Sequence, residues 1–346
     1  MSNAFCLYPF VSSYTNLSGD CLFCCYGKKA IQPDEIDSLR TKIYNDEKID
    51  HCSHCYDIEE AGLVSPRIEQ NTLWLDTPEI SEYIKNWTPG NTKISYYDIR
   101  YNNRCNLACI MCDARSSSLI AKEFNIENPK YANTFDDDAL INATQIYIAG
   151  GEPLITKECL QLLTKIGASD IQPNVIINTN LTRVDTKLLD IFKHLKNLLL
   201  VVSVDGYGRV NEYHRHPLNW NVFTENLDKI KDANIAIRFN TVVDAISVIN
   251  VHKLLSLTDQ VDSWKLEIIR SPDVLQLSNV PKHHKDEFSQ NVKKLFDTRF
   301  NNNDIINKIL DDINSKGDPE ALAKFIYATD SRKGINHKNY LDISID

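Results

Sequence analysis

Short apolar segments alternate with amphipathic segments from residue 93 onward, and this alternation constrains the fold more than any other feature of the chain. The apolar segments are rich in Val, Ile and Tyr, as buried parallel strands are. They lie at residues 94–101, 145–149, 174–178, 199–204, 235–243 and 264–269. Strands that alternate with helices build right-handed βαβ units. Six strands fall short of the eight in a complete (β/α)8 barrel, in which the chemistry takes place at the carboxyl ends of the strands.

Three cysteines follow the first of these strands directly. Cys105, Cys109 and Cys112 have the spacing C-x3-C-x2-C in the run CNLACIMC. Cysteine-ligated iron–sulfur cubes normally take four thiolates, so three thiolates on one loop leave one iron open to a small molecule. The alternative is part of a zinc site, which usually pairs C-x2-C with a second pair of Cys or His further along the chain.

The cysteine spacing resembles the signature of the radical S-adenosylmethionine (SAM) enzymes. This resemblance implies a partial (β/α)6 TIM-type barrel and makes the three cysteines the catalytic ligands of a 4Fe-4S cluster, whose open iron takes the amino and carboxylate groups of SAM. One electron from a flavodoxin- or ferredoxin-type donor then splits SAM into methionine and a 5′-deoxyadenosyl radical. Met111, before Cys112, stands where the family more often has an aromatic residue, and its thioether is expected to pack on the adenine.

Motifs at the ends of the later strands resemble the SAM-binding elements of the same family. The second strand ends in Gly150-Gly151-Glu152-Pro153, whose backbone is expected to accept hydrogen bonds from the SAM ammonium. The resemblance also implies that Asn180 lies near the ribose, that Ser203 reaches the ribose hydroxyls, and that Asn240 bonds the ribose or the carboxylate. Arg215 is expected to pair with the SAM carboxylate, since a guanidinium offers a fixed fork of donors. For the Gly-Gly turn and for Asn180, an ordinary turn-forming role stays open.

Three further residues near these motifs have two possible roles. Asp205 is expected to cap the turn after the fourth strand or to face the substrate. Val242 and Val243 could line the adenine, although plain core packing is the commoner role for valine.

A second group of cysteines precedes the barrel. The pattern C-x12-G-x4-C runs from Cys6 to Cys24, and Cys52-x2-Cys55 follows it. It resembles half of the auxiliary-cluster motif of SPASM and twitch-domain radical SAM enzymes, in which this domain follows the barrel. The resemblance implies a second, auxiliary 4Fe-4S cluster on these four cysteines. A four-cysteine zinc site is the alternative, and Cys25 could replace Cys24, because neighbouring side chains on a strand point opposite ways.

The run after the last of these cysteines extends the resemblance. YDIEEAGLVSPR resembles the C-x2-C-x4-E-x4-S-x-R continuation of an uncharacterised twitch-domain branch. The resemblance to that branch covers about residues 5–340. We therefore expect a twitch-like domain at residues 1–90, a radical SAM core at 91–275 and a helical extension at 276–346, in which we find no motif.

The composition is that of an ordinary globular protein, with 42% hydrophobic and 25% charged residues. No segment approaches the roughly 18 unbroken apolar residues of a membrane span, and the N-terminus lacks the features of a signal peptide, so a cytoplasmic location is expected. Ten cysteines in that reducing compartment more often ligate metal or do chemistry than form disulfides. A net charge of −9 disfavours broad binding of nucleic acid.

The expected function is that of a radical SAM enzyme acting on a peptide or protein substrate, because relatives with auxiliary clusters commonly cross-link, oxidise or epimerise ribosomally made peptides. A small metabolite, sugar or nucleotide substrate is one alternative. A non-catalytic iron–sulfur or zinc protein is another, and the barrel motifs count against it. Three cysteines remain outside both clusters. Cys21 or Cys25 could donate a hydrogen atom to a substrate radical, whereas Cys159 lies on the apolar side of a helix and is expected in the core.

Overall fold

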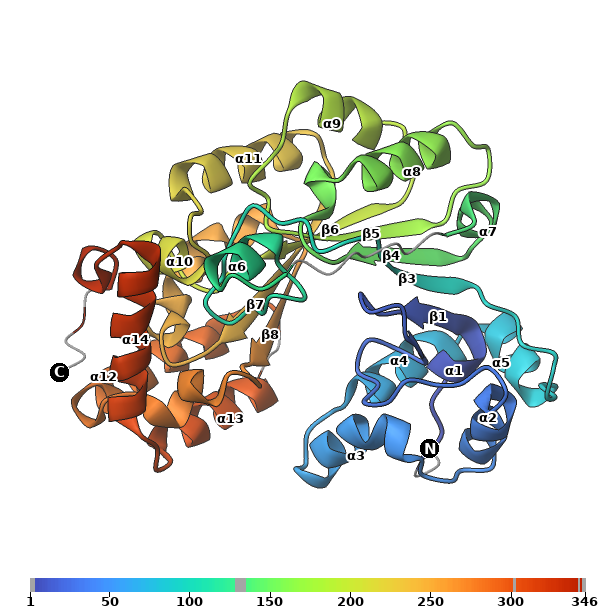
Figure 1. Cartoon of the computed structure of the whole chain (residues 1–346), viewed down its shortest axis with the longest axis horizontal. Coiled ribbons are helices and arrows are strands. Elements are labelled where there is room, and N and C mark those ends of the chain that lie inside the picture. The colour runs from blue at the N-terminus through green and yellow to red at the C-terminus, as the bar shows by residue number, and fades with distance from the viewer. Residues whose placement is uncertain (1–3, 128–134, 301–302, 342, 344–346) are drawn as a thin grey trace.

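One curved sheet organises the fold. In the computed structural model, which describes residues 4–127, 135–300, 303–341 and 343, this sheet has eight strands in the order β2-β1-β3-β4-β5-β6-β7-β8 (Figure 1). The strands are β1 (Ser12–Thr15), β2 (Cys21–Leu22), β3 (Tyr96–Arg100), β4 (Gln145–Ala149), β5 (Asn174–Thr179), β6 (Leu198–Ser203), β7 (Ala236–Val243) and β8 (Ser263–Ile268). Neighbours from β3 to β8 are all parallel. The predicted α/β fold with its parallel sheet is therefore confirmed.

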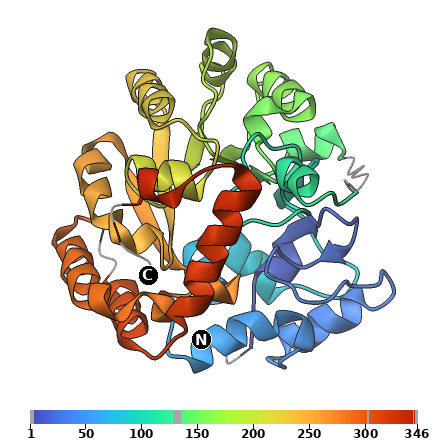
Figure 2. The same cartoon turned by 60° about the vertical axis from the view of Figure 1, so that its left-hand side comes forward.

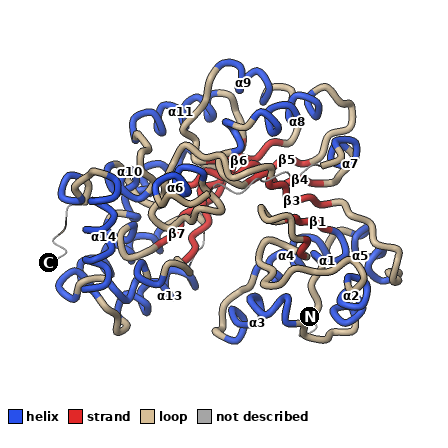
Figure 3. The backbone as a smooth tube through the Cα atoms, viewed as in Figure 1, coloured by secondary structure: helices blue, strands red, loops and turns tan. Residues whose placement is uncertain are grey.

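Helices lie on the outer side of the strands, as Figure 2 and Figure 3 show. They are α1 (Tyr8–Val11), α2 (Ile36–Tyr44), α3 (Ser53–Glu60), α4 (Pro66–Leu75), α5 (Pro78–Lys85), α6 (Ser118–Glu123), α7 (Asp137–Ile141), α8 (Lys157–Gly167), α9 (Thr186–Phe192), α10 (Arg209–His214), α11 (Trp220–Asp232), α12 (Lys285–Lys293), α13 (Asn303–Asn314) and α14 (Pro319–Lys333). In α8 the buried positions Cys159, Leu162, Leu163 and Ile166 follow helical spacing and face the sheet. None of the described helices is both long enough and apolar enough to cross a membrane.

The N-terminal segment departs from the expected arrangement, because it adds two strands to the sheet of the barrel. Strand β1 pairs in parallel with β3, with Ser12 opposite Tyr96, and β2 pairs antiparallel with β1. These strands have only four and two residues, and three of the four residues of β1 are Ser or Thr. A pattern so short carries no strand signal in the sequence. The sheet thus places the N-terminal cysteines directly beside the first barrel strand.

The apolar side chains form two separate cores. The N-terminal core gathers Phe10, Ile43 and Trp87 with neighbours from residues 6–87. The larger core joins the inner strands to the C-terminal helices, since Ile309 of α13 and Ile326 of α14 are fully buried in it. The helices after residue 276 therefore pack as part of the barrel's own core.

Single residues set the ends of the helices in the first half of the chain. Residues 72–92 contain the end of one helix and all of the next, because α4 ends at Leu75 and Pro78 starts α5. Proline fits the first turn of a helix and breaks the interior of one. The charged segment at 33–50 is helical only as α2, which ends before Asp46, a residue with a positive φ of 67°.

Candidate active site

A cavity of about 640 Å³ lies at the carboxyl ends of the parallel strands. It is lined by all but one of the residues expected at the first cluster and at SAM: Cys105, Cys109, Cys112, Gly150, Gly151, Glu152, Asn180, Ser203, Arg215 and Asn240. Pro153 is the exception, since it is buried at the start of a short 3-10 helix, η2 (Pro153–Ile155). Met111 and Val242 also face the cavity, whereas Val243 is fully buried in the core. Its volume is in the range typical of cofactor pockets.

The cysteine loop after β3 is held in place by two distant segments. The Ala108 N–H donates to the His216 carbonyl at 2.7 Å, and the Ile110 N–H donates to the His214 carbonyl at 2.9 Å. Lys333, in the last turn of α14, donates from Nζ to the Ala108 carbonyl at 2.7 Å. Nothing in the sequence around Lys333 signals this contact, because its partner lies 225 positions away.

The thiols of the loop have surroundings that suit metal-bound sulfur. Burial raises the pKa of Cys105 to about 12 and the pKa of Cys112 above its usual value. The Leu107 N–H points at Cys105 Sγ at 3.5 Å, and Arg215 Nη1 lies 3.9 Å from Cys109 Sγ. A bound metal would remove the thiol protons, and such donors would then stabilise the sulfur charge. The donor set therefore fits a cluster with three cysteine ligands.

The Gly-Gly turn after β4 lets two backbones approach closely. Both glycines have a positive φ, 85° at Gly150 and 55° at Gly151. A Cβ on Gly151 would lie 2.2 Å from the Arg104 carbonyl oxygen, next to Cys105. The following Glu152 N–H donates to that same carbonyl at 2.8 Å. The turn thus supports the cysteine loop as well as lining the cavity.

The Glu152 side chain is buried and joins two strand ends. Its carboxylate accepts hydrogen bonds from Thr179 Oγ1 at 2.7 Å and from the Asn180 N–H at 2.6 Å. Burial raises the pKa of Glu152 to about 7. Asn180 in turn donates from Nδ2 to Asn106 Oδ1 at 3.0 Å, which ties the end of β5 to the cysteine loop. The structure therefore gives Asn180 a loop-supporting role at the edge of the cavity.

Arg215 is a cation of the cavity, and buried acids fix its position. Its Nε lies 2.7 Å from Asp205 Oδ2, and His214 stands between Asp205 and Asp244, at 3.0 Å and 2.5 Å. Burial alone would raise the pKa of Asp205, but Arg215 and then His214 outweigh it and lower this pKa below its usual value. Burial would lower the pKa of His214, but Asp244 and Asp205 raise it to about 9. Asp205 thus holds Arg215 from behind and does not face the cavity, contrary to both expected roles.

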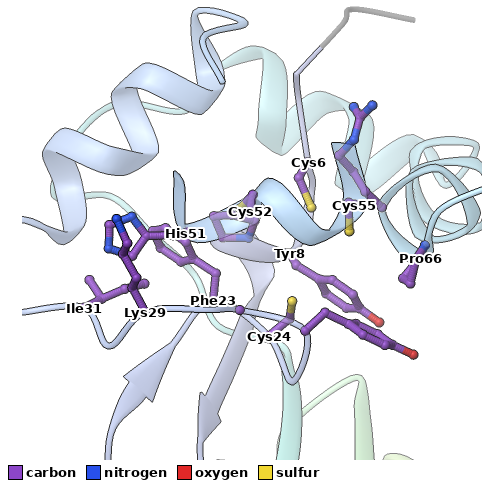
Figure 4. Close-up of a pocket in the computed structure, with 14 residues that line it drawn as sticks. Cys6, Tyr8, Phe23, Cys24, Lys29, Ile31, His51, Cys52, Cys55 and Pro66 are labelled. Carbon is purple, nitrogen blue, oxygen red and sulfur yellow. The ribbon is translucent and has the colours of Figure 1, made fainter. Parts of the chain in front are cut away.

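The four N-terminal cysteines lie around one small, mostly apolar cavity. Figure 4 shows the sulfurs of Cys6 and Cys55 pointing down toward Cys24, with Cys52 on the same cavity. Burial raises the pKa of each of the four thiols, that of Cys52 to about 12. Main-chain N–H groups point at three of these sulfurs and offset part of this rise in pKa. They are those of Tyr8 at Cys6, Tyr26 at Cys24 and Arg67 at Cys55. These donors fit a metal-bound thiolate site.

A charged pair supports this second site from behind. Arg67 donates from Nε to Glu59 Oε1 at 3.0 Å and from Nη1 to the Phe5 carbonyl, beside Cys6, at 2.7 Å. Ser65 also bonds Glu59. The E-x4-S-x-R spacing would place the acidic residue at Glu60, but Glu60 pairs with Lys48 at the surface. The acid that pairs with Arg67 is therefore Glu59, the neighbour of the motif residue Glu60.

Adjacent cysteines face the two different cavities. Cys24 lines the four-cysteine cavity, whereas Cys25 lines the large cavity with Cys105, Cys109 and Cys112. Cys25 lies beside Asp98, and burial followed by that carboxylate raises its pKa to about 12. Cys159 is fully buried in the core, and Cys21 is exposed. The linings of the two cavities thus meet at two adjacent residues.

Comparison with known proteins supports the assignment of the barrel. Residues 99–254 match the family model of the radical SAM superfamily. Two GTP 3′,8-cyclases are similar: that of Saccharophagus degradans is 27% identical over 31% of this chain and 34% of its own length, and that of Desulforamulus reducens is 29% identical over 26% and 28%. The match thus spans only about a third of the length of these relatives.

Solved structures resemble the chain only distantly. Streptococcus suis SuiB bound to S-adenosylmethionine is 14% identical, with a TM-score of 0.42, over 78% of this chain and 64% of that chain. Native anSMEcpe with bound AdoMet and Cp18Cys peptide is 16% identical, with a TM-score of 0.42, over 58% of both chains. Similarity at this level does not extend to the substrate. The family match covers the strands from β3 to β7 with their cysteine loop and Gly-Gly turn, so residues 99–254 form a radical SAM superfamily domain, and proteins of that superfamily bind a 4Fe-4S cluster and SAM.

Proposed function

We propose that this protein is a radical SAM enzyme that modifies a peptide or protein substrate with the help of an auxiliary cluster. The observation that carries the proposal is the position of Cys24 and Cys25, neighbours that face the four-cysteine site and the large cavity. A redox centre this close to the reacting atoms suits oxidation or cross-linking, in which the substrate must lose electrons. A flavodoxin- or ferredoxin-type donor in a reducing cytoplasm would supply the first electron.

The residues of the large cavity have distinct proposed roles. Cys105, Cys109 and Cys112 would hold the first cluster, and the cluster and SAM together supply hydrogen abstraction from an unactivated C–H bond. Arg215 would bind the SAM carboxylate, because Asp205 fixes its Nε and leaves its Nη atoms toward the cavity. Met111 offers an apolar surface for the adenine. The backbone at 150–152 would orient the ammonium, while Ser203 and Asn240 line the cavity where the ribose would lie.

The geometry of the four-cysteine site favours a cube over zinc. Zinc–sulfur bonds of about 2.3 Å bring the four sulfurs of a tetrahedral site to within about 4 Å of one another. In the part of the chain that the structure describes, no three or more Cys, His, Asp or Glu side chains are grouped so as to hold one metal ion. A cube binds each cysteine to a different iron, so its ligands stand farther apart. We therefore propose Cys6, Cys24, Cys52 and Cys55 as ligands of an auxiliary 4Fe-4S cluster.

A nucleotide substrate is the second candidate. It is favoured by the similarity to GTP 3′,8-cyclases and by the basic side chains of the barrel interior. Arg100 lies between the rings of Tyr14 and Tyr147, at 5.7 and 5.5 Å, but Asp98 neutralises its charge at 2.7 Å. Arg100 therefore attracts a phosphate less strongly than an arginine without a neighbouring carboxylate would.

The experiment compares both substrates on the reconstituted, reduced enzyme. Deoxyadenosine formation is measured with SAM alone, with GTP, and with peptides encoded beside the gene. A mass change in a peptide that depends on SAM supports the proposal. Turnover that rises only with GTP, with no peptide altered, overturns the proposed substrate class. A reconstituted protein that binds both clusters and never cleaves SAM overturns the enzymatic function itself.

A further inference from the structure

A groove of about 790 Å³ runs along the last strand of the sheet. It is lined by six consecutive residues, 265–270, which cover the end of β8 and the turn after it. Successive side chains of a strand point to opposite faces, so a groove that touches all of them follows the edge of the strand. Strand β8 pairs with β7 alone among the described strands. Its outer edge therefore faces the groove.

The outer edge of β8 presents main-chain N–H and C=O groups to the groove. Residues 265–268 have no main-chain hydrogen bond to any described residue outside β7. An edge strand of this kind presents a row of N–H and C=O groups that another extended chain can pair with. Peptide recognition by strand addition uses such an edge for affinity and uses the walls beside it for side-chain specificity.

The wall opposite β8 comes from the N-terminal segment and is apolar. Ile58, Ala61, Leu63 and Val64 line it, and Val64 is 59% exposed, which is unusual for a large aliphatic side chain. Helix α13 contributes Ile305 at the other side. Alternate side chains of an extended peptide would rest on this apolar surface.

The charges of the groove select the kind of peptide. Five carboxylates line it, against three cations, those of Lys265, Arg270 and Lys308. Lys265 pairs with Glu69 and Glu267, Lys308 pairs with Asp312, and Lys28, outside the groove, pairs with Asp57, which leaves Asp304 as the remaining carboxylate. His54 adds no charge near neutral pH, because burial and then Arg270 lower its pKa. With Lys28 counted, a formal excess of one carboxylate remains, which favours a basic over an acidic peptide.

The groove ends beside the active-site cavity. Arg270 Nη1 lies 2.7 Å from His54 Nε2, and both side chains stack on Tyr26, with centroid distances of 5.4 and 5.6 Å. Tyr26 directly follows Cys25, which lines the large cavity. Because β8 is parallel to the other barrel strands, its carboxyl end points to the same edge of the sheet as the cavity.

We infer that the groove binds an extended, basic segment of the substrate as an added strand on β8, and that this pairing directs the adjoining residues of the substrate into the cavity. The inference rests on the proposed peptide substrate. A six-residue strand spans roughly 20 Å, so the recognised segment would have about six residues, next to the modified one.

The test uses the full-length reconstituted protein and three fluorescein-labelled octapeptides: alternating Val and Lys, alternating Val and Glu, and the Val–Lys peptide N-methylated at alternate residues. We expect the Val–Lys peptide to bind by fluorescence anisotropy and to protect the β8 amides from hydrogen exchange. The other two should bind about tenfold more weakly or not at all, because they lose charge complementarity or main-chain donors. Val64→Lys should weaken binding of the Val–Lys peptide about tenfold. The matched control Val222→Lys changes an exposed valine of α11 and should leave that binding unchanged.

Three results would overturn the inference. The first is equal binding of the N-methylated peptide, and the second is Val–Lys binding that Val64→Lys does not alter. The third is a dimeric protein whose β8 amides are already protected without peptide, because a second copy of the chain would then cover the edge. A peptide modified at full rate by the Val64→Lys enzyme would refute the groove and leave the proposed function standing. Absence of any peptide modification, with GTP consumed instead, would refute the proposed function.

Discussion

At the residue scale, the site depends on side chains that act on one another over long sequence distances. Arg215 faces the cavity because Asp205, which is fully buried, holds its Nε at 2.7 Å. The order Asp205, His214 and Asp244 places one imidazolium between two carboxylates. Each buried charge has a partner, which is the condition for burying charge at acceptable cost. The guanidinium is therefore in place before SAM binds.

Replacing Arg215 should reveal how much this arrangement contributes to SAM binding. We expect Arg215→Ala to weaken SAM binding by about 1.5–3 kcal/mol, the range for a hydrogen bond to a charged group. Asp205→Asn should also weaken SAM binding, but by a smaller amount, because the guanidinium remains and only its ion pair with Asp205 is lost. Equilibrium dialysis with radiolabelled SAM measures both. An unchanged SAM affinity in Arg215→Ala would show that another group binds the carboxylate.

Gly151 provides a second test at this scale. A Cβ there would lie 2.2 Å from the Arg104 carbonyl oxygen, whereas a Cβ on Gly90, with φ of 80°, meets no atom within 4 Å. Gly90→Ala should therefore cost only the backbone strain, about 1–2 kcal/mol of unfolding free energy. Gly151→Ala should cost more and should also lower the iron bound at the cysteine loop. Equal losses in urea unfolding and equal iron content for the two variants would contradict the proposed packing role.

The sequence predicted the chemistry of single residues better than their contacts. The spacing of Cys105, Cys109 and Cys112 is local, so it could be read without the fold. The role of Asp205 could not be predicted in this way, because its partners come next to it only when the strand ends meet in the folded chain. Likewise the motif spacing pointed to Glu60, but helix α3 turns Glu59 toward Arg67.

At the element scale, helix α14 links the C-terminal extension to the chemistry. Its last turn carries Lys333, which donates to the Ala108 carbonyl at 2.7 Å and to Glu123 at 2.9 Å. The cation also suits the carboxyl end of a helix. The strands and barrel helices were predictable because their periodicity is strong. This contact was not, because a lysine in an amphipathic helix gives no sign of its partner.

Removing this lysine should loosen the cysteine loop. We expect Lys333→Met to lower the free energy of unfolding by about 1.5–3 kcal/mol, since a buried charged hydrogen bond is lost. It should also speed the loss of iron to a chelator. The matched control is Lys324→Met on the same helix, whose side chain is 81% exposed and whose loss should be nearly neutral. Equal chelation rates for the two variants would mean that α14 does not support the loop.

At the scale of the whole molecule, the N-terminal segment and the barrel meet through one sheet. Strand β1 pairs with β3, and the short turn after β2 brings Cys24 to one cavity and Cys25 to the other. The sequence suggested both cysteine sites but not their closeness, because strands of four and two residues leave no periodic signal. This arrangement is the basis on which we propose that an auxiliary cluster takes part in the reaction.

The presence of two clusters is tested most directly by the metal content of wild type and three variants after anaerobic reconstitution, with SAM cleavage assayed on each. Two 4Fe-4S clusters predict about eight irons and eight sulfides per chain. Replacing Cys105, Cys109 and Cys112 by Ala should halve the iron and abolish SAM cleavage. Cys24→Ala should lower the iron bound at the auxiliary site, whereas Cys25→Ala should keep all eight irons. Zinc with about four irons in the wild type, or loss of iron in Cys25→Ala but not in Cys24→Ala, would contradict the account.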